Sequence, residues 1–100
     1  MNRLETYNTD IIALCEKHKV KSLYAFGSVL TSNFDDNSAI DLIVDFAKIA
    51  IEEYADNYFD LKFLLQDLFQ RPVDLLEEKA IKNPYLKASI QQQKQLIYGQ

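Results

Sequence analysis

The spacing of apolar residues predicts three helices along the chain. From residue 4 to residue 19 apolar side chains recur every three or four positions, which is the period of one helix face. The same spacing returns from about residue 49 to residue 70 and predicts a longer helix, which ends at Arg71-Pro72 because proline disfavours helix for the residue before it. A last helix is predicted to begin at Asn83-Pro84, a capping side chain followed by proline, and to stop at Gly99.

Three short apolar runs have the pattern of strands. Residues 22–26 are apolar and aromatic and end at Gly27, and residues 73–77 form a similar run. Residues 39–46 alternate, so that one face would carry Ile40, Leu42, Val44 and Phe46 and the other Ala39, Asp41, Ile43 and Asp45. The order α-β-β-α-β-α predicts an α+β fold: a small mixed sheet of three strands or slightly more, covered on one face by helices.

The composition narrows the class of protein. One hundred residues, 48% of them apolar, predict a single domain spanning 1–100 with one core. A net charge of −4 with scattered lysines argues against non-specific binding to nucleic acid backbones. The single cysteine, Cys15, excludes an internal disulfide and fits a reducing cytosol. No apolar run is long enough to span a membrane and the N-terminal residues lack a secretory signal, so we expect a cytoplasmic protein.

The residues with the clearest chemical potential lie between Tyr24 and Phe46. Gly27 and Ser28 follow the first strand, ten residues intervene, and Asp41 lies in the next strand. Gly27 permits close approach of the backbone to phosphate oxygens, and the amide and hydroxyl of Ser28 can donate to them if a short helix begins there. Carboxylates on neighbouring strands are suitable ligands for a divalent metal bound to a triphosphate. Asp74, in the last predicted strand, is the candidate second carboxylate.

This combination resembles the minimal nucleotidyltransferase domain of the DNA polymerase beta-like superfamily. The family pattern is Gly-Ser, ten residues, Asp-x-Asp, and a further Asp on a later strand; Gly27-Ser28, Val29 to Ser38, Asp41 and Asp74 match it in spacing. The resemblance covers essentially the whole chain. It implies nucleotide-binding by Gly27 and Ser28, catalytic and metal-binding roles for Asp41 and Asp74, Mg²⁺ as cofactor and ATP as substrate. It further implies transfer of AMP to a protein hydroxyl, as the antitoxin of a pair with a HEPN-domain toxin.

One position departs from the family pattern. Ala39 stands where the first Asp of the Asp-x-Asp motif is expected, and a methyl group cannot ligate magnesium. Loss of a metal ligand commonly lowers the rate roughly a thousandfold. Asp35 or Asp36 could approach from the loop, although loops place ligands poorly. An alanine inside an otherwise intact motif is compatible with natural divergence and with a deliberate knock-out.

Each of these residues also has a purely structural interpretation. Gly27-Ser28 can be an ordinary turn, Asp41 an edge charge that discourages aggregation, and Asp74 a solvated side chain. Cys15 is expected to pack in the core and His18 to interact with its helix end rather than to bind a ligand. The aromatic residues of the long helix are expected in the core, with any surplus marking a protein interface.

Two functions from different classes therefore remain. The first is a Mg²⁺-dependent nucleotidyltransferase whose activity is impaired by Ala39. The alternative is a catalytically dead binding module that neutralises a HEPN toxin by complex formation, and an unrelated α+β scaffold is a third interpretation. Because the domain is small, a protein partner or self-association into a homo-oligomer is expected to supply the acceptor site.

Overall fold

The computed structural model describes residues 6–27 and 38–99. Within these ranges the elements follow one another as α1 (Asn8–Lys17), β1 (Val20–Phe26), β2 (Ile40–Phe46), α2 (Ile51–Phe69), β3 (Val73–Glu77), α3 (Pro84–Gln93) and β4 (Gln95–Gly99). A short 3₁₀ helix, η3 (Glu78–Ala80), follows β3. The predicted α+β fold with a small mixed sheet is confirmed.

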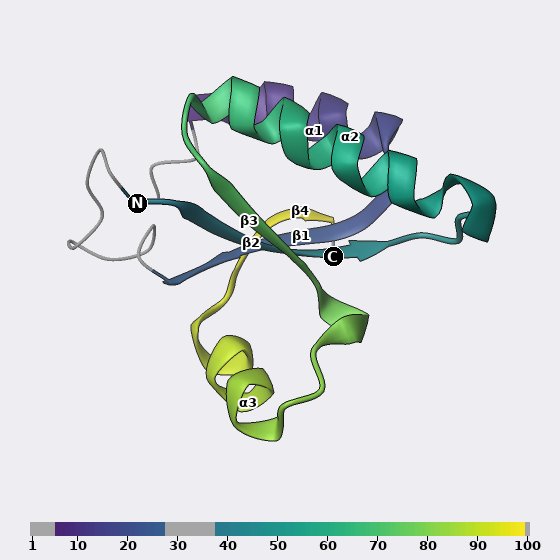
Figure 1. Ribbon diagram of the computed structural model, residues 1–100. Helices are drawn as coiled ribbons and strands as arrows, with labels where there is room; N and C mark the ends of the chain where they lie inside the picture. The colour runs from purple at the N-terminus through teal and green to yellow at the C-terminus, as the bar shows by residue number, and fades with distance from the viewer. Residues whose placement is uncertain (1–5, 28–37, 100) are drawn as a thin grey trace.

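The strands form one sheet in the order β3-β2-β1-β4. β1 is antiparallel to both of its neighbours, whereas β2 and β3 are parallel and are connected through α2. Helices α1 and α2 lie side by side over one face of the sheet, and α3 lies on the other side (Figure 1). The two faces therefore differ in their cover, and this difference determines where a site can be open.

The core lies between the sheet and the pair α1 and α2. The predicted alternation of β2 is confirmed, because its even-numbered apolar residues all belong to this core. Helix α1 contributes Ile11 and Cys15, and α2 contributes Leu61, Leu65 and Phe69. Ile43 points to the opposite face and is also fully buried, as is nearly all of Ile90 on α3. The second face is therefore partly covered and not a uniformly solvated surface.

The C-terminal segment differs from the prediction of one long helix. Asn83 caps α3 as expected, because its side-chain oxygen accepts hydrogen bonds from the amides of Tyr85 (2.9 Å) and Leu86 (3.2 Å). The helix ends at Gln93, however, and residues 95–99 form β4 along the open edge of β1. Pairing of unsatisfied backbone groups on β1 outweighs the local helical spacing of Leu86, Ile90 and Ile97.

Gly99 consequently has a different role from the predicted helix stop. It adopts a φ of +92°, and a Cβ at this position would lie 2.1 Å from the carbonyl oxygen of Lys21. Only glycine fits where β4 approaches the backbone of β1 this closely.

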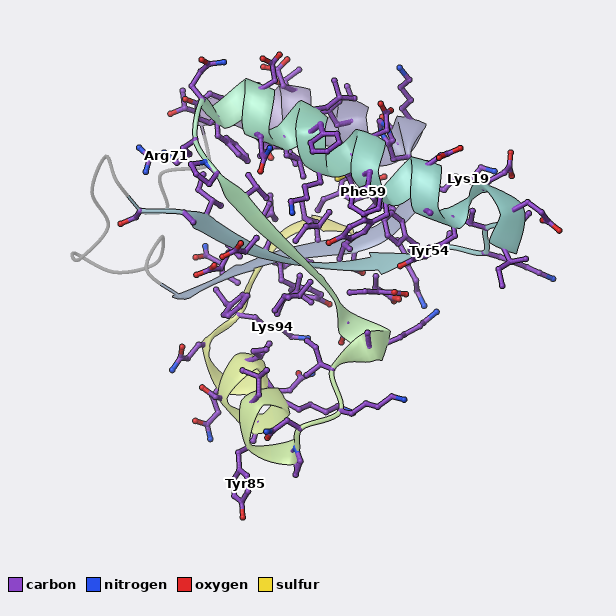
Figure 2. The ribbon with its side chains drawn as sticks, in the orientation of Figure 1. Lys19, Tyr54, Phe59, Arg71, Tyr85 and Lys94 are labelled. Atoms are coloured by element: carbon purple, nitrogen blue, oxygen red, sulfur yellow. The ribbon has the colours of Figure 1, made fainter. Side chains whose placement is uncertain are left out.

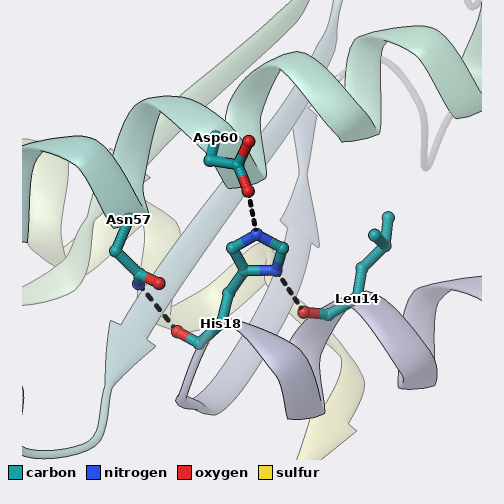
Figure 3. Close-up of polar contacts among 4 residues, drawn as sticks. All are labelled: Leu14, His18, Asn57 and Asp60. Carbon is teal, nitrogen blue, oxygen red and sulfur yellow. Dashed lines mark hydrogen bonds and ion pairs between the residues drawn. The ribbon is translucent and has the colours of Figure 1, made fainter.

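His18 joins α1 to α2 (Figure 3). Its Nε2 lies 2.6 Å from a carboxylate oxygen of Asp60 and its Nδ1 lies 2.7 Å from the carbonyl oxygen of Leu14. Asn57 donates to the carbonyl of His18 over 2.8 Å. The imidazole is almost completely buried. These contacts support the expected structural role and place His18 on the face of the sheet away from Asp41.

The other side chains singled out on α1 and α2 are mostly buried or bonded to the sheet. Cys15 is fully buried, and this burial raises the pKa of its thiol to about 12, which fits core packing rather than nucleophilic chemistry. Tyr54 donates to Glu77 and Tyr58 to the carbonyl of Leu75, so both hydroxyls are tied to β3. Phe59 and Phe63 are the exposed surplus, at 49% and 58%, and their rings stack on each other.

Candidate active site on the sheet

Asp41 and Asp74 are direct neighbours in the sheet. β2 and β3 run parallel, and their register pairs Ile40 with Val73 and Asp41 with Asp74. Neighbouring strands lie about 4.8 Å apart, and residues paired in register point to the same face. The two carboxyl groups lie close enough for Asp74 to raise the pKa of Asp41. The structure therefore brings together the two acids that the sequence selected.

The acid pair lies on the face opposite α1 and α2. Its sequence neighbours Leu42, Val73 and Leu75 are core residues beneath these helices. Since side chains alternate along a strand, Asp41 and Asp74 point the other way. Asp41 is half-buried and Asp74 is exposed, so this part of the sheet is accessible.

The surroundings of Asp41 disfavour its ionised form. The pKa of Asp41 is raised by burial first, and then by the hydrogen bond to Asp74 and by its negative charge. Both burial and the neighbouring carboxylate disfavour the ionised form of Asp41, because a negative charge there is poorly solvated and is repelled by Asp74. A divalent cation between the two groups would offset that repulsion. The donor set, two hard carboxylates with open access, fits Mg²⁺ in kind.

Gly27 lies directly beside Asp41. Phe26, the residue before it, pairs with Asp41 across β1 and β2. Gly27 adopts a φ of +76°, and a Cβ there would lie 2.7 Å from Oδ2 of Asp41. The left-handed backbone thus favours glycine, and a Cβ here would have to displace the Asp41 carboxylate. The predicted proximity of Gly27 to the acid pair is present in the structure.

Of the other candidate site residues, Ala39 alone lies in the described part of the chain. Ser28, Asp35 and Asp36 lie outside the described residues. Ala39 is half-buried and directly precedes β2. Among the residues that the structure describes, there is no group of three or more His, Cys, Asp or Glu side chains that could hold a metal. Asp41 and Asp74 are the two candidate carboxylates that the structure places side by side next to Gly27.

Two basic residues near this end of the sheet were not selected from the sequence. Arg71 donates from Nη1 to the carbonyl of Ser38 over 3.2 Å, which joins the start of β3 to the segment before β2. Lys94 lies at the junction of α3 and β4, with Nζ 4.0 Å from the centre of the Tyr24 ring. Arg71 could have been considered because it precedes a strand bearing an acid. Lys94 could not, because its place depends on β4, which was predicted as helix.

Comparison with known proteins decides the family. A family model described as a nucleotidyltransferase domain matches residues 11–97 of the chain. This chain belongs to the nucleotidyltransferase domain family. Two proteins of Methanocaldococcus jannaschii, both named "putative protein adenylyltransferase", are 42% and 36% identical to it over 85 residues. Each of these two alignments covers 85% of this chain and 82% of the relative.

Solved structures of a minimal nucleotidyltransferase and of toxin–antitoxin complexes share the fold. A "putative minimal nucleotidyltransferase" superposes with a TM-score of 0.77 at 24% identity, over 95% of each chain. A toxin–antitoxin structure with AMP-PNP gives 0.72 at 23% identity, covering 93% of this chain and 73% of the other. A Shewanella oneidensis complex of a tri-AMPylated HEPN toxin with its MNT antitoxin gives 0.67 at 20% identity, covering 96% and 72%.

Among the described residues of this nucleotidyltransferase-family chain, none of the helices has the length and apolar character needed to cross a membrane.

Proposed function

We propose that this chain binds ATP with Mg²⁺ and transfers AMP to a hydroxyl group of a partner protein. The observation that carries the proposal is the register of Asp41 and Asp74 beside Gly27, on the face of the sheet opposite α1 and α2. The protein adenylyltransferase names of relatives 36–42% identical support the choice of AMP and of a protein acceptor.

Each of the four candidate site residues would have a separate role in the transfer. Asp41 and Asp74 would hold Mg²⁺, which supplies Lewis-acid stabilisation of the phosphate charge when bound. Gly27 would let the triphosphate approach the backbone, and Ser28 would donate to its oxygens. The acceptor hydroxyl attacks the α-phosphorus and forms a new oxygen–phosphorus bond. The bond from that phosphorus to the β-phosphate oxygen breaks, pyrophosphate leaves, and the hydroxyl proton passes to solvent.

A HEPN-domain toxin is the acceptor that we propose, with this chain as its antitoxin in the cytoplasm. One solved structure that contains a chain of this fold is a complex of a tri-AMPylated HEPN toxin with an MNT antitoxin. An isolated domain of this size has little chain left to form an acceptor site, so a partner or a second copy of the chain would complete it. We propose that Ala39 limits the rate of transfer, because it leaves β2 with one carboxylate where the family pattern has two.

The experiment compares the chain with Ala39→Asp and Asp41→Asn variants. Each is incubated with a HEPN toxin, Mg²⁺ and α-labelled ATP, and label on the toxin is measured. We expect slow transfer by the parent chain, transfer faster by roughly a thousandfold in Ala39→Asp, and none in Asp41→Asn. Equal, negligible labelling by the parent and Ala39→Asp would contradict the transferase proposal.

Ala39 also favours a second candidate, neutralisation by binding alone. In that case the parent chain would form a complex with the toxin and rescue growth, while mass spectrometry of the toxin shows no added AMP. Asp41→Asn would then rescue growth as well as the parent does. Rescue that requires Asp41 would instead support transfer.

A further inference from the structure

Lys94 carries a positive charge on the same sheet face as the acid pair. Its backbone amide donates to the carbonyl of Ile90 over 2.8 Å, which fixes it at the end of α3. The next residue, Gln95, pairs with Ala25 of β1. Because Phe26 pairs with Asp41 on the other side of β1, the backbone of Lys94 lies about two strand spacings, roughly 10 Å, from Asp41.

The side chain of Lys94 extends over this face rather than into solvent. Its ammonium lies above the ring of Tyr24, 4.0 Å from the ring centre. Tyr24 shares the face of Asp41, since its neighbours Leu23 and Ala25 are core residues under α1 and α2. Only 15% of the lysine side chain is exposed. Figure 2 shows Lys94 on the α3 side of the sheet.

The charge of Lys94 is only weakly compensated. Its one ion pair in the described part of the chain is with Glu78, at 3.5 Å, and the Glu78 side chain is 30% exposed. An N···O distance of 3.5 Å is long for a charge-assisted hydrogen bond, so Lys94 can exchange Glu78 for an anion that it contacts more closely. A triphosphate carries several charges where Glu78 carries one. The flexible four-carbon stem of lysine allows the ammonium to turn toward an anion at Gly27.

We propose that Lys94 binds the triphosphate of the nucleotide and that Glu78 competes for it when no nucleotide is present. The inference rests on the proposed function, because it assumes that ATP binds at Asp41 and Asp74. It deepens that function by adding a cation to a face whose other selected side chains are acidic. Lys79, the other lysine that pairs on this face, is 71% exposed and engages Asp45 at 3.5 Å.

The test measures the Kd for ATP, ADP, AMP and adenosine with Mg²⁺ by calorimetry. Lys94→Met keeps the length of the stem and removes the charge, and Lys94→Arg keeps the charge. Lys87→Gln is the matched control, since it removes a lysine from the exposed surface of α3. We expect Lys94→Met to raise the Kd for ATP about tenfold, with a smaller effect on AMP and none on adenosine. Lys94→Arg and Lys87→Gln should bind ATP as the parent does.

Glu78→Gln separates phosphate binding from a purely structural role. Breaking the ion pair from either side should lower the melting temperature slightly in both Glu78→Gln and Lys94→Met. The Kd for ATP should move in opposite directions, falling about twofold to fivefold in Glu78→Gln because the competing carboxylate is gone. If both variants weaken ATP binding, or if Lys94→Met binds ATP as the parent does, the assignment of Lys94 is overturned. Absence of ATP binding by the parent chain itself would overturn the proposed function along with it.

Discussion

Gly27 and Asp41 lie so close together that a Cβ on Gly27 would displace the Asp41 carboxylate. A Cβ on Gly27 would lie 2.7 Å from Oδ2 of Asp41, and the backbone of Gly27 is left-handed with a φ of +76°. The turn after β1 is thus shaped around the carboxylate of β2. This contact joins the two halves of the sequence motif, which are separated by more than ten residues along the chain.

Gly27→Ala is expected to displace the Asp41 carboxylate as well as strain the backbone. We predict a loss of stability of about 1–2 kcal/mol and loss of ATP binding. Chemical denaturation and calorimetry measure the two effects. Gly99→Ala is the matched control. It should also destabilise the fold, because its Cβ would meet the carbonyl of Lys21. Since Gly99 lies away from the acids, this variant should bind nucleotide with the affinity of the parent. Equal effects of both variants on affinity would contradict the role of Gly27.

Asp41→Asn is expected to stabilise the protein in the absence of divalent cations. The folded-state pKa of Asp41 is raised above the ordinary value of 3.8 by burial and by Asp74. The folded protein therefore holds this proton more tightly than the unfolded chain, so this contribution to stability is present below pH 3.8 and is lost as pH rises through the folded value. The asparagine variant escapes that loss, and its advantage in the free energy of unfolding should be larger at pH 7 than at pH 4.

Denaturation curves at the two pH values test this, with Asp67→Asn on the exposed surface of α2 as the control. That control should show no comparable gain between pH 4 and pH 7. A lower stability of Asp41→Asn than of the parent at pH 7 would contradict the account of repulsion within the acid pair.

Mg²⁺ is expected to bind in competition with the proton of Asp41, whose pKa is raised. We predict that added Mg²⁺ raises the melting temperature of the parent chain more at pH 8 than at pH 5, because ionised Asp41 is the ligand form. Asp41→Asn should lose the effect. Ala39→Asp should enlarge it by adding a third carboxylate. Thermal melts with and without Mg²⁺ measure the shifts, and an equal Mg²⁺ response in Asp41→Asn would place the metal elsewhere.

His18→Leu is expected to weaken the packing of α1 on α2. The substitution removes the contacts to Asp60 and Leu14 and fills the space with an apolar side chain of similar size. We predict that the free energy of unfolding falls by about 1–3 kcal/mol. Asp60→Asn, which retains a polar partner that can accept a hydrogen bond, should cost less. Urea denaturation compares the variants. Because His18 lies under the far face of the sheet, ATP affinity at a temperature well below the melting point should be unchanged, and a selective loss of affinity would contradict its structural role.

Local sequence signals were sufficient where one residue or one periodicity decides the structure. Asn83-Pro84 begins α3, Gly27 ends β1, and the alternation of β2 separates the core face from the face of Asp41. Such features need no knowledge of distant parts of the chain, because the capping side chain, the φ angle and the pleat are all local. The sequence also selected Asp41 and Asp74 as the acids.

The sequence failed where a distant segment outweighs the local preference. Residues 95–99 continue a helical spacing, yet β1 has an open edge whose backbone groups are satisfied by a strand, so β4 forms there. This in turn places Lys94 over Tyr24, a relationship that no spacing along the chain could predict.

The sequence alone determined the fold class, most helix and strand positions, and the identity of the two acids, because hydrophobic period and turn chemistry are properties of adjacent residues. Tertiary structure alone decided that Asp41 and Asp74 are register partners, that α3 lies on the opposite side of the sheet from α1 and α2, and that Lys94 joins the acids on one face. The physical reason is that strand register and sheet order are set by pairing between segments far apart in the chain, where the sequence supplies compatible surfaces but not their alignment.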